Sequence, residues 1–119
     1  MNQKSNHPGI ETEPVNIEGV RVGFQAKYFS NNVSYDDILD SAKKAVKYYS
    51  DKIDKVVLFC NKNLDTSAKN YVATVKLLSE NNIVLEPFCN DSILDTINVT
   101  EEYSPIRALF FNKISLNFD

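Results

Sequence analysis

The amino-acid sequence predicts an α/β fold in which a mixed sheet begins with an N-terminal β-hairpin and continues through βαβ-type units. Three observations predict it. Apolar and polar side chains alternate across residues 20–29, apolar residues recur at helical spacing after 34 and again after 65, and a continuous apolar run fills 56–60. Because strands and helices then alternate along the chain, the later strands are expected to pair in parallel through right-handed crossovers.

The hairpin is expected from two strands, at residues 10–15 and 20–29, with turn-forming residues at 16–19 between them. Strand geometry places Gln25 and Lys27 on the same face of the second strand. These two residue types are rarely buried without partners. Two interpretations stay open here: a half-exposed strand whose polar face meets solvent, or a functional site.

The first helix is predicted to begin at Ser34, a favourable N-cap, and to run to about Tyr49, with two acids in its first turn. The apolar run at 56–60 is typical of a strand that is covered on both faces. The remaining elements follow in order: a helix capped by Asp65 or Thr66 and ending at 81–82, a strand at 83–88, a short helix at 91–97, and an apolar tail from 103 that fits either helix or strand.

Length and composition are those of one globular domain, so residues 1–9 are interpreted as a flexible leader and 10–119 as a single domain. The net charge of −3 does not indicate a nucleic-acid binder, although Lys43, Lys44 and Lys47 could contact phosphates. A solvated helix face is the alternative for these lysines. Two cysteines, no signal-like apolar run and no long apolar segment indicate a reducing, cytoplasmic setting without a membrane span.

Several enzyme classes are disfavoured by what the chain contains. The single histidine, His7, lies in the polar leader, so a hydrolase that uses a Ser–His or Cys–His pair lacks its base. None of the three glycines opens a helix, so a dinucleotide-binding turn is missing as well.

A metal site can be built from the hairpin. Gln25 and Lys27 lie about 6–7 Å apart along one strand face, and Glu11 and Glu13 are likewise two residues apart on the preceding strand. Antiparallel pairing would bring a carboxylate within reach of the amide and the ammonium. Carboxylate and amide oxygens suit Mg²⁺, and a lysine beside the ion can orient a water and offset charge on a phosphate.

These residues carry a resemblance to a known family. GIE at 9–11 followed by FQAK at 24–27 resembles the PD-(D/E)XK nuclease superfamily, and within it the Mrr-like restriction endonuclease branch. The longer run GIETEP, then GFQAKYF, then a helix that contains Ser41, is similar to nuclease domains fused to STAND-type NTPases in antiphage defence. The resemblance implies a restriction-endonuclease-like fold, cytoplasmic restriction or antiviral defence, and Mg²⁺- or Mn²⁺-dependent cutting of DNA.

By this resemblance Glu11 takes the place of the family's metal-binding aspartate, Gln25 is the second ligand and Lys27 is the catalytic lysine. Glu13 is an alternative or additional ligand, and the Ala26 carbonyl is a further one. DNA, a second copy of the chain and a larger NTPase-containing protein are the implied partners. The family's usual helix before the hairpin is missing, so the alternative is a catalytically incomplete module that binds DNA or a partner protein.

Overall fold

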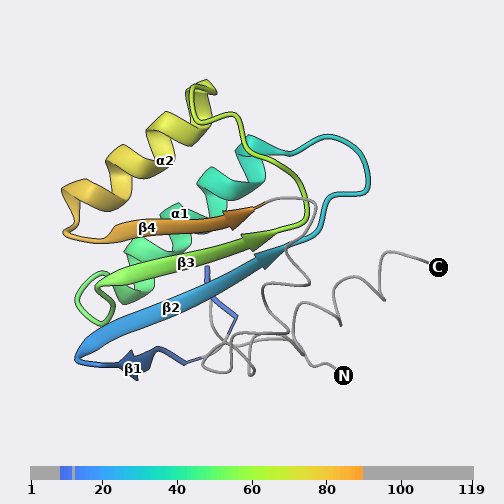
Figure 1. Cartoon of the computed structure of the whole chain (residues 1–119). Coiled ribbons are helices and arrows are strands. Elements are labelled where there is room, and N and C mark those ends of the chain that lie inside the picture. Colours follow the sequence, from blue (N-terminus) through green and yellow to red (C-terminus); the bar gives the residue numbers. More distant parts are fainter. Residues whose placement is uncertain (1–8, 12, 90–119) are drawn as a thin grey trace, which may run out of the picture.

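The strands form one mixed sheet in the order β1-β2-β3-β4 (Figure 1). The computed structural model describes residues 9–11 and 13–89. β1 and β2 pair antiparallel, whereas β2, β3 and β4 pair in parallel, which confirms the predicted α/β class with its N-terminal hairpin. The elements are β1 (Val15–Ile17), β2 (Val20–Lys27), α1 (Tyr35–Tyr49), β3 (Lys55–Cys60), α2 (Lys69–Glu80) and β4 (Val84–Cys89).

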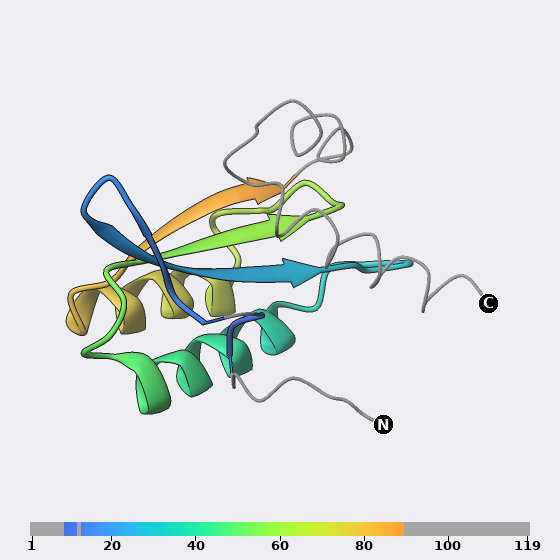
Figure 2. The same ribbon diagram turned by 90° about the horizontal axis from the view of Figure 1, so that it is seen from below.

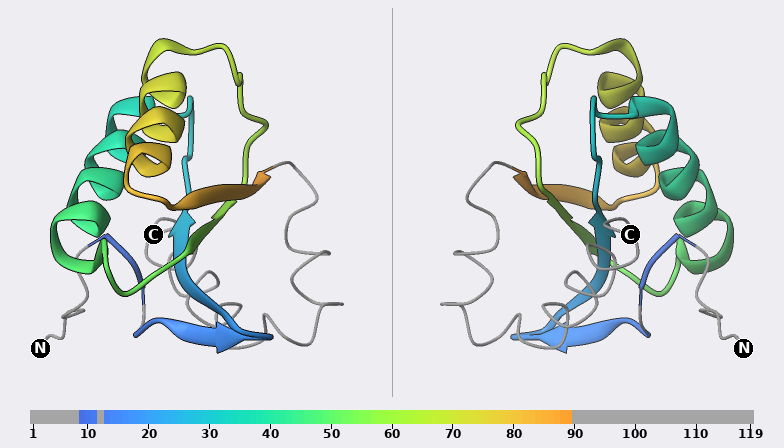
Figure 3. Two further views of the ribbon diagram at one scale, coloured as in Figure 1. Left: turned by 90° about the vertical axis from the view of Figure 1, so that its left-hand side faces the viewer. Right: turned by 90° about the vertical axis from the view of Figure 1, so that its right-hand side faces the viewer.

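Both helices cover the same face of the sheet, as Figures 2 and 3 show from two directions. On this face α1, α2 and the strands share a buried core that includes Ile38, Ala42, Leu58 and Leu78. The opposite face is buried too. There Phe59 stacks against its neighbours on β2 and β4, with ring centroids 6.3 Å from Phe24 and 5.5 Å from Phe88. Burial on both faces explains why β3 reads as a continuous apolar run.

The hairpin is shorter than predicted. The turn predicted at 16–19 is narrower in the structure: it consists of Glu18 and Gly19, which both have positive φ, and the Asn16 side chain accepts a hydrogen bond from the Gly19 amide at 2.9 Å. The strand predicted at 10–15 is wrong: β1 is Val15–Ile17, and Pro14 precedes it. A two-residue turn fixes the register, so pairing with β2 begins at the turn and leaves the earlier residues to dock elsewhere.

The helix caps were predicted with mixed success. Ser34 caps α1 as expected, its hydroxyl accepting from the Asp37 amide at 3.2 Å. Neither Asp65 nor Thr66 caps α2, which begins at Lys69 without a side-chain cap. Asp65 instead accepts from the amide and the hydroxyl of Ser67, because a short Asp side chain can satisfy a local turn equally well.

The predicted short helix at 91–97, the tail and nearly all of the leader lie outside the described residues. Neither helix in the described part of the chain has the length and hydropathy that a bilayer span requires.

An exposed ion pair ties the amino ends of the parallel strands together. The Arg21 guanidinium donates to both carboxylate oxygens of Asp54, at 3.1 and 2.9 Å. The Asp54 backbone donates to Arg21 and accepts from Val84, so this residue links β2 to β4 across the start of β3. Hydrogen bonds from the Arg21 side chain and backbone lower the pKa of Asp54 to about 2.

This lowered pKa predicts an acid-sensitive contribution to stability. A carboxylate with a depressed pKa stabilises the fold fully above its unfolded pKa of about 3.9, and the contribution is lost as the pH falls toward 2. We expect the free energy of unfolding of wild type to fall more steeply between pH 5 and pH 2 than that of Asp54→Asn, in urea melts at fixed salt. Arg21→Gln should flatten the acid limb in the same way; equal slopes in all three proteins would contradict the prediction.

Candidate active site

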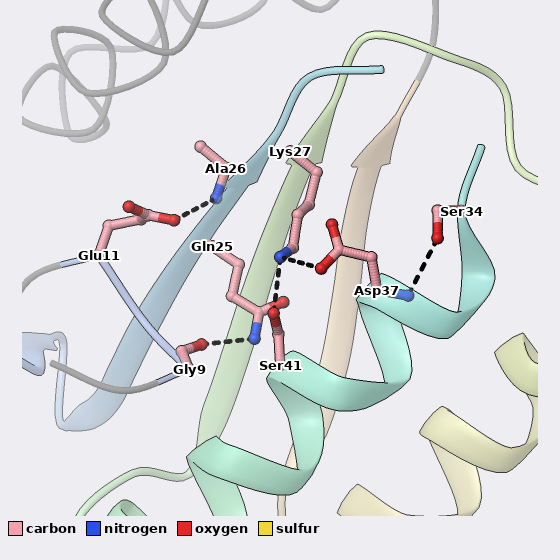
Figure 4. Close-up of polar contacts among 8 residues, drawn as sticks. All are labelled: Gly9, Glu11, Gln25, Ala26, Lys27, Ser34, Asp37 and Ser41. Carbon is pink, nitrogen blue, oxygen red and sulfur yellow. Dashed lines mark hydrogen bonds and ion pairs between the residues drawn. The ribbon is translucent and has the colours of Figure 1, made fainter. Parts of the chain in front are cut away.

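Gln25 is buried and Lys27 is partly buried on the helix-facing side of β2. Gln25 is 3% exposed, and the Lys27 side chain is 16% exposed. A solvent-facing strand is therefore the wrong interpretation of this pair. Both side chains extend toward α1, as the alternation along β2 predicts (Figure 4).

The Gln25 side chain is only half satisfied. Its amide nitrogen donates to the Gly9 carbonyl at 2.5 Å, and this contact fixes the orientation of the amide, since a carbonyl can only accept. The other end, Oε1, has no hydrogen-bond partner within residues 9–11 and 13–89. Buried polar atoms nearly always have a partner, so this oxygen is available to a water or a cation.

The Lys27 ammonium lies between two acceptors on α1. It donates to the Ser41 hydroxyl at 2.6 Å and to the Asp37 carboxylate at 3.3 Å. Asp37 and Ser41 are four residues apart, so they share one helix face. The sequence analysis named Ser41 only as part of the resemblance, did not expect its contact with Lys27, and missed Asp37. The i, i+4 spacing of two acceptors on the helix that follows the lysine strand is the signal that could have found them.

Glu11 reaches the pair from the edge of β2. β1 pairs with residues 20–22, and farther along the same edge the Glu11 amide donates to the Phe24 carbonyl at 2.7 Å. The Glu11 carboxylate accepts from the Ala26 amide at 3.3 Å. The Glu11 carboxylate thus lies beside Ala26, on the edge side of β2 (Figure 4). The side chains of Gln25 and Lys27, on either side of Ala26 in the sequence, turn toward α1 instead.

Two glycines make room for this approach. Gly9 has φ +82°, and a Cβ there would lie 2.4 Å from the Ala45 nitrogen and 2.6 Å from the Ser41 carbonyl oxygen. Ile10 is buried against Gly23, where a Cβ would meet its Cγ2 at 2.9 Å. Residues 9–11 therefore dock between α1 and β2 only because both contact points lack a side chain.

Oxygen donors of the kinds that a hard divalent cation prefers lie on two sides of this part of β2. Phe24 and Ala26 have the same parity on β2, so the Ala26 carbonyl points to the edge where Glu11 lies. The Gln25 amide oxygen lies on the side that faces α1. A carboxylate, an amide and a backbone carbonyl are ligand types that suit Mg²⁺ or Mn²⁺. Within residues 9–11 and 13–89, no group of three or more His, Cys, Asp or Glu side chains is placed to hold a metal, so this position offers Glu11 as its one acidic side chain.

Glu13 is exposed. Burial, and after it the negative charge of Glu13, raise the pKa of Tyr49. Glu11 contacts β2 through both its amide and its carboxylate, and these contacts favour Glu11 as the metal-binding acid.

The three lysines of α1 that the sequence analysis expects at DNA phosphates are all exposed. Lys44 follows Ser41 by three residues and so lies on nearly the same stripe of α1. The Lys47 ammonium lies 5.2 Å from the centre of the exposed Tyr48 ring. Lys43 and Lys47 share a different stripe, so Lys44 is the best placed of the three for a phosphate near the candidate site.

Comparison of the chain with protein-family models and with curated proteins finds no match to either. The nuclease interpretation therefore depends on the residues described above and on their geometry.

Proposed function

We propose that this chain is a divalent-metal-dependent DNA endonuclease domain of the Mrr-like PD-(D/E)XK type. The observation that carries the proposal is the buried Gln25, whose Oε1 lacks a partner within the described residues, beside the partly buried side chain of Lys27. Burying two such groups side by side costs free energy that a purely structural strand would avoid by using apolar residues.

Each residue has a distinct role in the proposed reaction, in which a water oxygen bonds to phosphorus as the bond to the leaving ester oxygen breaks. Glu11, Gln25 and the Ala26 carbonyl would hold the cation, which when bound polarises the phosphate and lowers the pKa of a coordinated water. Lys27 orients the attacking water and offsets the negative charge that develops on the phosphate. The partial burial of Lys27 strengthens this effect, because water screens its charge less.

The resemblance also supports a setting for this activity. We propose that the domain acts in cytoplasmic antiphage defence, as part of a larger NTPase-containing assembly or as a homo-oligomer. Cutting both strands of a duplex requires two active centres, which a second copy would supply.

One observation favours a second candidate function. The Lys27 ammonium is directed to α1 while the Glu11 carboxylate lies on the edge side of β2. If the two groups do not act on one phosphate, the chain is a catalytically incomplete module that binds DNA or a partner protein.

Manganese binding separates the two functions. We expect calorimetric titration with Mn²⁺ to show one site in wild type, and Glu11→Gln to weaken it by roughly tenfold or more, since even indirect supports of a metal contribute that much. Glu13→Gln is the matched control and should bind Mn²⁺ and nick supercoiled plasmid as wild type does. A wild type that neither binds Mn²⁺ nor nicks plasmid would leave the binding module as the function.

A further inference from the structure

The contacts of Lys27 with α1 assign a role to residues that do not touch the metal ligands. The ammonium makes two hydrogen bonds to side chains of one helix face, and the bond to Ser41, at 2.6 Å, is the shorter. The Lys27 side chain is 16% exposed and the Asp37 side chain 50%, so Ser41 holds the inner side of the ammonium while Asp37 faces solvent.

The helix that presents these acceptors is held firmly at this point. Ile38 and Ala42, next to Asp37 and Ser41 in sequence, are 1% and 2% exposed. Ser34 caps the first turn through the Asp37 amide, and Gly9 packs against the Ser41 carbonyl. A functional side chain is oriented best by groups on such a rigid element.

Lysine needs this support more than most residues do. Its long side chain loses considerable rotamer entropy when it is fixed, and it tends to extend toward water. We infer that Asp37 and Ser41 are positioning residues that hold the Lys27 ammonium within the site, an inference that rests on the proposed function of Lys27. The Ser41 hydroxyl orients the ammonium without neutralising it, and the half-exposed Asp37 carboxylate balances its charge until a phosphate replaces it.

Chemical labelling tests this positioning without any need for activity. The full chain would be reductively methylated with formaldehyde and cyanoborohydride, and the Lys27 rate measured by mass spectrometry relative to exposed Lys43. We expect Asp37→Asn and Ser41→Ala to raise the relative rate by about 1.5- to 5-fold, the range that corresponds to typical ion-pair strengths. Asp36→Asn is the matched control: it removes the same charge from the same helix turn, but its carboxylate contacts Asn70 rather than the lysine.

A cleavage assay supplies the second readout. Ser41→Ala should lower kcat for plasmid nicking with little change in KM, and Ser41→Thr, which keeps the hydroxyl, should restore both kcat and the wild-type labelling rate. Unchanged Lys27 labelling in Asp37→Asn and Ser41→Ala, or an equal rise in Asp36→Asn, would overturn the inference. Raised labelling in a protein whose wild type does not cut DNA would overturn the proposed function and leave both residues as positioning groups of a non-catalytic lysine.

Discussion

Lys27→Met is expected to lower the rate of plasmid nicking by about 100- to 1000-fold, the effect of removing one preorganised charge-stabilising donor. Methionine keeps the unbranched apolar stem of lysine, so packing between β2 and α1 is preserved. The lost contacts are one ion pair with a half-exposed acid and one hydrogen bond. The free energy of unfolding should therefore change by about 1 kcal/mol or less in urea melts.

Lys55→Met is the matched control. Lys55 also lies on a parallel strand and also pairs with an acid, Glu86, at 2.7 Å, but it lies at the amino end of β3. This variant should nick plasmid at the wild-type rate in the same preparation. The assignment of Lys27 fails if Lys27→Met cuts as wild type does, or if both variants lose activity equally.

Gly9→Ala is expected to have the largest effect on stability. A Cβ at this position would collide with the backbone of α1 at Ser41 and Ala45, and a φ of +82° is unfavourable for alanine. Residues 9–11 would then no longer dock between α1 and β2, and Ile10 would become exposed to solvent. Burial of an isoleucine side chain contributes about 1.5–3 kcal/mol, so we expect the free energy of unfolding in urea to fall by roughly that amount. Mn²⁺ binding should fall with it, because Glu11 is displaced.

Gly19→Ala separates the clash from the backbone strain. Gly19 has a similar φ of +87°, yet a Cβ there would meet nothing within 4 Å. This variant should lose about 1 kcal/mol, the cost of left-handed backbone for a residue with a side chain, and should keep its Mn²⁺ affinity. Equal losses of stability and of metal affinity in Gly9→Ala and Gly19→Ala would show that the close packing of Gly9 against α1 is not what holds residues 9–11 in place.

Much of the architecture follows from local patterns that tertiary packing did not override. Three local patterns each predicted the element that the structure has. They are the two-residue alternation of β2, the Ser34 cap of α1 and the apolar run of β3. The first strand could not be placed correctly, because its register depends on a two-residue turn in which Glu18, a non-glycine residue, has a positive φ. The prediction of where α2 starts was wrong because the Asp65 side chain can either cap the helix or accept hydrogen bonds in a local turn. In the structure it accepts from Ser67.

The candidate site was predictable only within a single strand. Strand periodicity places Gln25 and Lys27 on one face, and burial of that face follows from its apolar neighbours. The choice between Glu11 and Glu13 depends on how Gly9 packs against α1, and the role of Ser41 depends on which helix face overlies β2. Both are contacts between elements distant in sequence. The i, i+4 spacing of Asp37 and Ser41 marks a pair of acceptors on one helix face, but it does not say which strand that face meets.

The docking of residues 9–11 has a practical consequence for how the protein is produced. The acid of the proposed centre arrives on a short stretch that interdigitates with α1 through Gly9 and Ile10, ahead of the first strand of the sheet. An expression boundary set at β1 would remove Glu11 together with Ile10, which is buried in the core, so we expect a less stable protein that lacks the proposed metal-binding carboxylate. A bulky affinity tag fused close to Gly9 is expected to disturb the same docking. The position of the tag therefore decides whether an activity screen tests the proposed function.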